Sequence, residues 1–479
     1  PLHWEWDERI SPESMKDTQW PAAGKALVVN YKAPKGTDKD FADVKVQVRY
    51  EIYDGIPSIS KSVHVTNEGN NDVIVDKMEV EILPVPVTLK DALYVEGTMN
   101  SGNENHDRNN GKERYKQWED VDGTNGKIIS RYAAPAGDNT IASGMGYDTG
   151  NIGPNYRLAK DETFNSYKVY QMFYSNSYYE WQMMEVKKMY RVLFPQTADA
   201  PLIYHIISSD DATVKKGIDQ AHNAGFNMVL LSFGSGVNVE DTSASNIAKY
   251  KSLCDYAHKK GMLLGAYVMQ AARGGNESFS GCWGTMRCMC GTDAHETLEN
   301  TLEFIDQTGL DCLEVDGIYP GAICTAANHS GHEGVEDSQT KQWEYAVHDF
   351  YRELRARNVY INSPDWNFTV GASMAVIGYQ EPGFNVTPWR QLIYGREMAY
   401  YGTFEKVPAM GWTLVPLSPY QGGSDSSFWP YDEKIMAYDF MIGMNMMYGI
   451  TGSYRGGNGL YQGEVSQNVI ETWGEFYNK

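Results

Sequence analysis

The segment Pro201–Phe233, PLIYHIISSDDATVKKGIDQAHNAGFNMVLLSF, contains one full unit of the repeat that organises the second half of the chain. A short apolar segment at its start is followed by an amphipathic helix pattern, a glycine, and a second segment that is apolar throughout. Strands that are apolar on both faces and that alternate with helices are typical of a parallel sheet covered by helices on both sides. The segment therefore predicts an α/β architecture from about residue 201 onward.

Five units of this kind are clear along the chain. The strands that we expect are Ile203–Ile207, Met228–Phe233, Met262–Tyr267, Cys312–Val315 and Val359–Asn362. The helices before the last four strands end at Gly225, Gly261, Gly309 and Asn358, where a left-handed residue is favoured. Weaker apolar segments follow at Ala375–Tyr379, Pro408–Val415 and Met446–Ile450. Eight units predict a (β/α)8 TIM barrel over residues 198–479 rather than an open doubly wound sheet.

The preceding residues, 1–197, show a different pattern. In Val44–Tyr53 and Ile59–Val65 polar and apolar side chains largely alternate, which is the period of a half-buried strand. The polar stretch Asn100–Gly126 predicts a long loop. We therefore expect a multidomain chain in which an N-terminal β-sandwich, of the supersandwich type, precedes the α/β barrel. The change of pattern places the domain boundary between Phe194 and Pro201.

Charge and hydropathy restrict the partners. The 41 basic and 62 acidic side chains leave a net charge of −21, which disfavours binding to nucleic acid or to an anionic membrane. No run of 18 apolar residues could span a bilayer. Aromatic residues make up 13% of the chain, and such rings stack on sugars, although a tyrosine-rich core would also account for them. Pro1–Asp7 is not a leader sequence, so we expect a secreted or periplasmic protein whose signal peptide has been removed.

The cysteines and histidines after the third expected strand suggest loop structure rather than a metal centre. The six cysteines fit no standard zinc-binding spacing. A disulfide from Cys282 to Cys288 or Cys290 is one expectation, with the neighbouring Trp283 as a platform for a sugar ring; an ordinary loop is the other. The group His329-x-x-His332-Glu333 has too few ligands for a catalytic metal. We expect no metal there and instead sugar contacts, with His332 as the candidate, or hydrogen bonds within the loop.

The C-terminal ends of barrel strands form the active site of this architecture, and two acidic residues stand at the end of the fourth expected strand. Asp316 follows an apolar run directly and precedes a glycine, which places its carboxylate at the barrel mouth. Glu314, two residues earlier, faces the same way one layer deeper. Hydrolysis of a glycoside needs two carboxyl groups, and Asp316 supplies one of them. The alternative is that Asp316 only caps a following helix.

Several side chains at other strand ends are candidates for the remaining roles. Glu381, beside the aromatic Tyr379, is the expected acid, because an apolar environment keeps a carboxyl group protonated near neutral pH. An ion pair with Arg390 or Arg396 is the alternative role of Glu381. Asp365 could replace it as the acid, or bind sugar hydroxyls together with its neighbour Trp366. The acids that end the first strand are further candidates for substrate binding, namely Asp210 and Asp211.

These segments resemble those of the retaining α-galactosidases and α-N-acetylgalactosaminidases of glycoside hydrolase families 27 and 36. The segment Leu313–Asp316 resembles the end of the fourth strand of that clan, where the nucleophile lies, with Glu314 in place of a lysine. Tyr379–Glu381 resembles the segment that carries the acid/base, with glutamate in place of aspartate. Met410–Trp412 resembles the seventh strand, so Trp412 is a further candidate contact, and Tyr50–Pro57 is similar to a segment of the family 36 sandwich.

The resemblance implies a retaining, exo-acting α-glycosidase that releases a galactose-like sugar from an oligo- or polysaccharide. That sugar would be galactose, N-acetylgalactosamine or a modified galactose, with Asp316 as nucleophile and Glu381 as acid/base. No cofactor is then expected. Two alternatives remain open: a calcium-dependent α-glycosidase of the family 97 type, in which glutamates hold the ion, and a barrel that binds glycan without catalysis.

Overall fold

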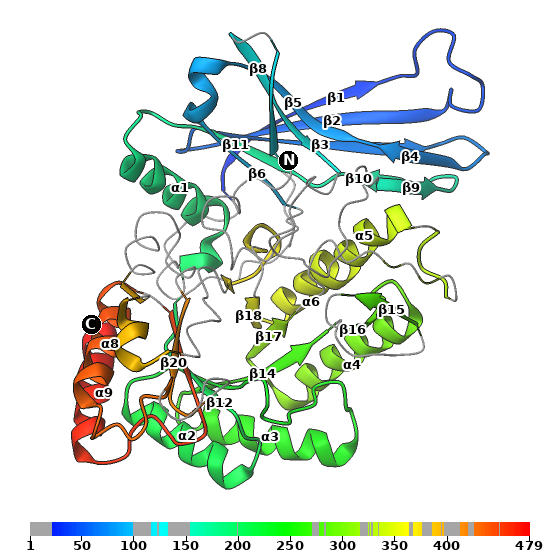
Figure 1. Cartoon of the computed structure of the whole chain (residues 1–479). Coiled ribbons are helices and arrows are strands. Elements are labelled where there is room, and N and C mark those ends of the chain that lie inside the picture. Colours follow the sequence, from blue (N-terminus) through cyan, green and yellow to red (C-terminus); the bar gives the residue numbers. More distant parts are fainter. Residues whose placement is uncertain are drawn as a thin grey trace.

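The structure is a computed structural model, and most of the chain is described in it. The described residues are 22–98, 116–121, 124–132, 154–198, 200–270, 277–281, 284–316, 324, 326, 329–333, 335–363, 367–375, 386–393, 395–396, 412–419, 426–449 and 451–479. Figure 1 shows two parts: β-sheets formed by the first part of the chain, and a helix-covered sheet formed by the rest. In the described part of the chain no helix has the length and apolar character needed to cross a membrane.

The described residues of the N-terminal part form three antiparallel sheets. The largest has the order β1 (Gly24–Tyr31), β2 (Val44–Tyr53), β3 (Ser58–Asn67), β11 (Val169–Phe173), β6 (Leu93–Gly97), and β10 (Thr163–Asn165) also pairs with β3. The others are β5 (Glu79–Pro86), β8 (Asn125–Arg131) and β7 (Lys116–Asp120), and the pair β4 (Val73–Lys77) and β9 (Pro154–Leu158). A short 3-10 helix, η2 (Val87–Ala92), precedes β6. Burial alternates along much of β3, as the period-two pattern predicts.

Two expectations for this part are wrong. Residues 116–120, expected in a long loop, form strand β7 and pair with β8. The chain also forms a helix before the parallel sheet, α1 (Tyr179–Leu193), followed by the 3-10 turn η3 (Pro195–Ala198). Helix α1 buries Met183, Val186 and Tyr190 on one face, which is a helical spacing that the β-rich interpretation of this region overlooked.

In the described ranges of the second part, eight strands pair into one curled parallel sheet. They are β12 (Ile203–Ile206), β13 (Met228–Leu231), β14 (Leu263–Met269), β17 (Cys312–Asp316), β18 (Tyr360–Ser363), β19 (Met374–Ala375), β20 (Trp412–Pro416) and β21 (Thr451–Arg455). Their order is β19-β18-β17-β14-β13-β12-β21-β20, and each recorded pairing within the sheet is parallel. This is the order of a barrel opened between its sixth and seventh strands; among the described residues no pairing joins β19 to β20.

Helices follow the strands and cover the sheet. They are α2 (Asp211–Asn223), α3 (Ala244–His258), α4 (Thr292–Thr308), α5 (Val335–Trp343), the π-helical η4 (Glu344–Asp349), α6 (Phe350–Ala356), the 3-10 turn η5 (Phe368–Val370), α8 (Ile435–Met447) and α9 (Glu464–Tyr477). A hairpin of β15 (Ser278–Gly281) and β16 (Gly284–Arg287) separates β14 from α4. The predicted left-handed residues at the four helix ends are confirmed, with φ between 60° and 75° at Gly225, Gly261, Gly309 and Asn358.

The eighth strand lies later in the chain than expected. Residues 446 and 447 of the expected strand Met446–Ile450 belong to the last turn of α8, and Gly449 follows with a φ of 63°. The strand itself is Thr451–Arg455. Its small and polar residues carry no apolar run, whereas α8 is apolar enough to resemble a buried strand at its end. The apolar run thus predicted the wrong element.

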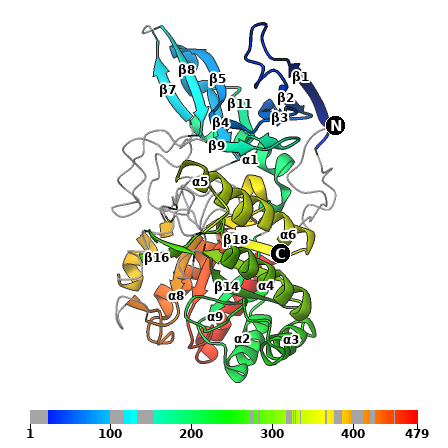
Figure 2. The same cartoon turned by 90° about the vertical axis from the view of Figure 1, so that its right-hand side faces the viewer.

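The two parts of the chain meet where strands β17 and β18 end. The amide of Gln196, just after α1, donates to the backbone carbonyl of Phe368 in η5 at 2.9 Å. The rings of Tyr190 and Phe368 contact edge to face at 6.1 Å. Arg157 of β9 pairs with Glu333, ahead of α5, at 2.9 Å. Figures 1 and 2 show the same arrangement, with strand β9 of the N-terminal part next to α5.

Candidate active site

Asp316 ends strand β17 at the edge of the sheet where the strands terminate. Its neighbour in register is Met269 of β14, and its backbone carbonyl accepts from the amide of Gln270 at 2.9 Å. The hydroxyl of Tyr267, also on β14, donates to Oδ2 of Asp316. The next described helix, α5, begins only at Val335. These two contacts join Asp316 to the neighbouring strand, and the residue is partly exposed at the edge of the sheet.

Glu314 lies one layer deeper on the same strand. Its Oε2 accepts from the Ser232 hydroxyl at 3.3 Å and lies 3.9 Å from Nδ1 of His205. Burial raises the pKa of Glu314 to about 7; Arg455 opposes this rise and the charge of Asp316 adds to it. Near neutral pH this carboxyl group is thus divided between its protonated and ionised forms.

His205 is neutral at physiological pH. Its side chain is fully buried on β12, and burial, together with the positive charge of Arg455, lowers its pKa to about 3. The contact between His205 and Glu314 is therefore no salt bridge. Neither ring nitrogen of His205 forms a hydrogen bond with a described residue, and the same holds for the side-chain amide of Asn362, the register partner of Glu314 on β18. Buried polar groups require partners, so both residues are candidates to bind a polar ligand or solvent.

Arg455 and two aromatic rings complete this edge of the sheet. The guanidinium group of Arg455, on β21, donates to the backbone carbonyl of Phe233 at 2.6 Å. The Phe233 ring, just after β13, contacts the Tyr267 ring at 5.5 Å. Five neighbouring strands (β17, β14, β13, β12 and β21) thus supply an acidic pair, a neutral imidazole, a cation and an aromatic wall. Such a set can bind sugar hydroxyls and supply a nucleophilic carboxylate.

Most of the residues that surround Asp316 and Glu314 were not predicted from the sequence. The sequence predicts Tyr267 as the last residue of a strand but indicates no functional role for it. His205 lies within the apolar segment Ile203–Ile207, so it was predicted only as part of a strand. Arg455 lies on the strand that was misplaced. One signal was available, because each of these polar side chains is on or next to the C-terminal end of a parallel strand.

The first of the two acids after the first strand caps a helix. Asp210 is the N-terminal cap of α2, and its Oδ2 accepts from the backbone amide and the hydroxyl of Thr213, both at 3.0 Å. These hydrogen bonds lower the pKa of Asp210. Asp211 is the exposed first residue of the same helix. The described contacts of Asp210 therefore favour helix capping over substrate binding.

The histidine loop also differs from expectation. His332 lies beside Cys288, Cys324 and His329, and together they form the only group among the described residues that is arranged to hold a metal ion. Glu333 instead pairs with Arg157. Cys288 and Cys290 have free, buried thiols, so the expected disulfide to either of them is wrong. The thiol of Cys290 donates a hydrogen bond to the backbone carbonyl of Ser338 at 3.6 Å.

The remaining candidates lie outside the described residues. These are Trp283, Asp365, Trp366, Tyr379 and Glu381. Trp412 opens strand β20, and only its backbone is described.

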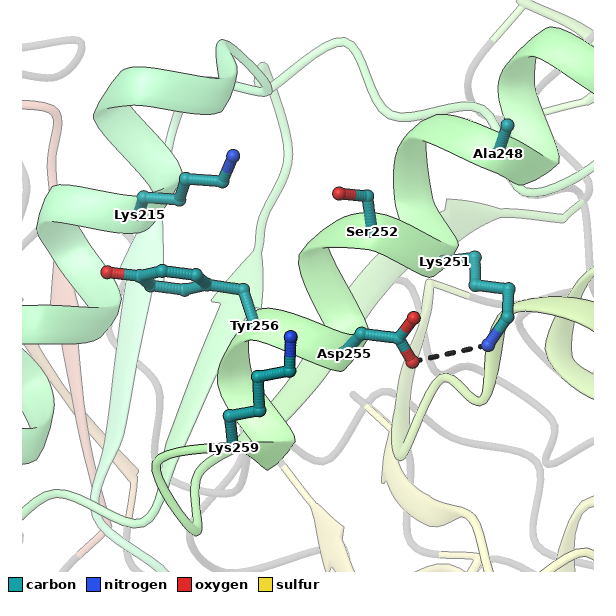
Figure 3. A pocket seen from close by; sticks show the side chains of 7 residues that line it. All are labelled: Lys215, Ala248, Lys251, Ser252, Asp255, Tyr256 and Lys259. Atoms are coloured by element: carbon teal, nitrogen blue, oxygen red, sulfur yellow. Dashed lines mark hydrogen bonds and ion pairs between the residues drawn. The ribbon is translucent and has the colours of Figure 1, made fainter.

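A surface pocket elsewhere does not have the features of an active site. Figure 3 shows it between α2 and α3, on the outside of the sheet, lined by Lys215, Ala248, Lys251, Ser252, Asp255, Tyr256 and Lys259. Its one acid, Asp255, pairs with Lys251 at 3.2 Å and is half-exposed. None of the strand-end residues around Asp316 lines this pocket.

Comparison with solved structures identifies relatives in fold. An α-galactosidase from Lactobacillus brevis superposes with a TM-score of 0.60 at 13% identity, over 96% of this chain and 68% of that one. The family 36 α-galactosidase AgaB of Geobacillus stearothermophilus gives 0.57 at 12%, over 95% and 73%. AgaA from the same organism, in a variant solved in complex with raffinose, gives 0.54 at 12%, over 91% and 67%. No protein-family model and no curated protein sequence matches the chain. The predicted resemblance to family 36 is thus confirmed for the fold.

Proposed function

We propose that this chain is a retaining α-glycosidase that removes a terminal galactose-like sugar from an oligo- or polysaccharide. The observation that carries the proposal is the position of Asp316. In a fold shared with family 36 α-galactosidases, this carboxylate ends the fourth strand of the parallel sheet. The proposal includes closure of the sheet into a (β/α)8 barrel and the packing of the N-terminal sheets as a sandwich, over domains 1–197 and 198–479.

Asp316 is the nucleophile in this proposal. Its carboxylate attacks the anomeric carbon and forms a covalent glycosyl-enzyme, which water then hydrolyses with net retention of configuration. The Tyr267 hydroxyl, which donates to Oδ2, orients the carboxylate for attack. The same hydrogen bond stabilises the negative charge that returns to Asp316 when the intermediate breaks down.

Glu381 is the proposed acid/base, with Asp365 as the residue to test in its place. The acid protonates the leaving oxygen in the first step, and the resulting base activates water in the second. A retaining mechanism requires the two carboxyl groups to lie about 5–5.5 Å apart. Trp283, Trp366, Tyr379 and Trp412 are proposed to contact the sugar.

The polar layer beneath Asp316 supports a sugar as the ligand. His205 and Asn362 are buried polar side chains whose ring nitrogens and amide have no hydrogen-bond partner among the described residues. Glu314 lies next to both, through its contact with His205 and its register pairing with Asn362. The hydroxyl groups of a hexose bound at this edge of the sheet would provide hydrogen-bond partners for His205, Asn362 and Glu314. The raffinose bound by a fold relative fits a galactose-like substrate.

The decisive experiment combines a substrate screen with two matched variants. Nitrophenyl α-glycosides of galactose, N-acetylgalactosamine, glucose and mannose are assayed with the wild type, with Asp316→Asn and with Asp210→Asn. We expect turnover of a galactose-type substrate and a loss of several orders of magnitude in Asp316→Asn. The control Asp210→Asn, an exposed helix cap, stays near wild type.

Two results would contradict the proposal. Near-normal activity of Asp316→Asn would exclude Asp316 as the nucleophile. Sugar binding without turnover on the whole panel would favour a glycan-binding protein that has lost catalysis. Mass mapping of a mechanism-based covalent label then distinguishes Asp316 from any other nucleophile.

A further inference from the structure

Four side chains from two distant segments converge next to the β15–β16 hairpin. Cys288 follows β16 directly, whereas Cys324, His329 and His332 lie between β17 and α5. Their sulfur atoms and one ring nitrogen of each histidine all lie within 4.8 Å of one another. Both thiols are fully buried and both imidazoles are half-buried. We propose that these four residues form a structural zinc site.

The donor set and its dimensions fit zinc. Two thiolates and two imidazoles are the ligands of the Cys2His2 class of structural sites, and soft sulfur donors disfavour calcium and magnesium. With bonds of about 2.3 Å to sulfur and about 2.0–2.1 Å to nitrogen, ligand atoms in a zinc tetrahedron are about 3.3–3.8 Å apart. The separation of Cys324 Sγ and His329 Nε2 is 3.4 Å, within that range. The wider separations of the group need a contraction of about 1 Å, which side-chain rotations can provide.

Neighbouring contacts orient two of the ligands. Nδ1 of His329 lies 2.7 Å from the carbonyl oxygen of Ser330, which can only accept, so this nitrogen carries the proton. Nε2 is then the nitrogen with a free lone pair, and it is the one that faces the Cys324 sulfur. Metal-bound histidines are commonly fixed in this way by a backbone carbonyl. The amide of Cys324 in turn donates to the hydroxyl of Ser338 on α5 at 3.1 Å.

Backbone geometry holds the two segments together. Gly331, between the two histidines, has a φ of 111°, a region that favours glycine. A Cβ atom at Gly331 would lie 2.0 Å from the carbonyl oxygen of Cys290, so no other residue fits without movement of the backbone. The loop of the histidines is thus pressed against the residues that follow β16. This close approach brings His329 and His332 to Cys288.

Two neighbouring candidate ligands lie outside the group of four. The thiol of Cys290 contacts the Cys288 thiol and donates to the carbonyl of Ser338, and the carboxylate of Glu333 pairs with Arg157. The two cysteines and two histidines therefore form a set of four protein ligands, which leaves no position for a substrate. The site would not take part in catalysis. It would fasten the chain that continues from Asp316 to the hairpin, and so stabilise one side of the candidate active site.

The first test measures the metal in the full-length wild-type protein. The protein is expressed with added zinc sulfate, purified under reducing conditions without chelator, and analysed by elemental mass spectrometry. We expect one zinc ion per chain. Replacement by Co(II) should produce the visible absorption of a tetrahedral site together with charge-transfer bands from thiolate to metal. Protein without zinc and without these bands would overturn the proposal, as would mass mapping of a disulfide between Cys288 and Cys324.

The second test uses matched variants. Cys324→Ala and His329→Ala should lose the zinc, whereas Cys254→Ala, which removes another buried free thiol on α3, should keep it. A strong chelator should lower the thermal midpoint of the wild type and of Cys254→Ala, but not that of Cys324→Ala. Retention of zinc by both ligand variants would overturn the assignment. Circular dichroism checks that the variants fold, and the measurements on the wild type do not depend on them.

Discussion

Replacement of Glu314 by glutamine tests the electrostatics of the candidate active site. Glutamine keeps the size of the side chain and can accept from Ser232, but it has no charge. The Glu314 side chain is only 14% exposed, and burial raises its pKa from 4.5 to about 7. The folded protein thus binds this proton more tightly than the unfolded chain does. Stability is therefore lost as the pH rises through the window from 4.5 to 7 and levels off above it.

The size of this effect follows from the two pKa values. Ionisation of Glu314 costs the folded state about 1 kcal/mol at pH 5 and about 3 kcal/mol at pH 8, because one pKa unit corresponds to about 1.36 kcal/mol. Glu314→Gln removes this cost. We expect the variant to gain about 2 kcal/mol in stability relative to the wild type between these two pH values.

Denaturant unfolding at pH 5 and pH 8 measures this difference, with tryptophan fluorescence as the signal. Glu296→Gln, at an exposed position on α4, is the control and should show no such change with pH. A stability difference between Glu314→Gln and the wild type that stays constant from pH 5 to pH 8 would refute the reasoning. So would a variant that is less stable than the wild type at pH 8.

Three further changes have defined outcomes. Tyr267→Phe removes the hydrogen bond to Asp316. A hydrogen bond to a charged group contributes about 1.5–3 kcal/mol, so kcat should fall about 10- to 100-fold. The loss should affect mostly the second step, hydrolysis of the glycosyl-enzyme, and an initial burst of nitrophenol would show that this step has become slow. An unchanged kcat would contradict the role of Tyr267. Asp210→Ala should lower the stability of the protein through loss of the α2 cap, with kcat/KM unchanged. A large loss of activity would instead indicate that Asp210 binds the substrate. Asn358→Ala should lower stability by up to about 1 kcal/mol, because at a φ of 60° the Cβ atom lies close to the following carbonyl oxygen and alanine lacks the polar side chain with which asparagine bonds locally. Asn358→Gly, which has no Cβ atom, is the control and should be tolerated.

The sequence predicts the strands of the parallel sheet well where apolar runs end at a glycine or asparagine. Gly225, Gly261, Gly309 and Asn358 each have the expected left-handed backbone, and each precedes a strand in the expected place. The prediction from apolar runs is wrong at β21, because Thr451–Arg455 contains mainly small and polar residues. The position of this strand depends on its pairing with β12 and β20. An isolated pattern does not contain that tertiary information.

In the candidate site, too, local features could be predicted from the sequence and features that depend on strand pairing could not. Asp316 and Glu314 could be predicted because a strand and its end are local features. His205, Tyr267 and Arg455 could not, since their proximity depends on the order in which separate strands pair. The cysteine–histidine group is a clearer case: Cys288 is far from the other three in sequence, and only the packing of the loop against β16 brings them together.

The contacts between the two parts of the chain also bear on how the protein is synthesised. Gln196 bonds to a carbonyl 172 residues later, and the Thr369 hydroxyl to one 271 residues earlier. Contacts between such distant residues form slowly, because a long loop must close first. As the ribosome releases the chain, the N-terminal sheets are complete well before Phe368 and Thr369 emerge. Until then, aromatic side chains such as Tyr190, which is buried in the folded protein, lack their contact with Phe368 and remain more exposed. During that interval the nascent chain can aggregate or bind chaperones.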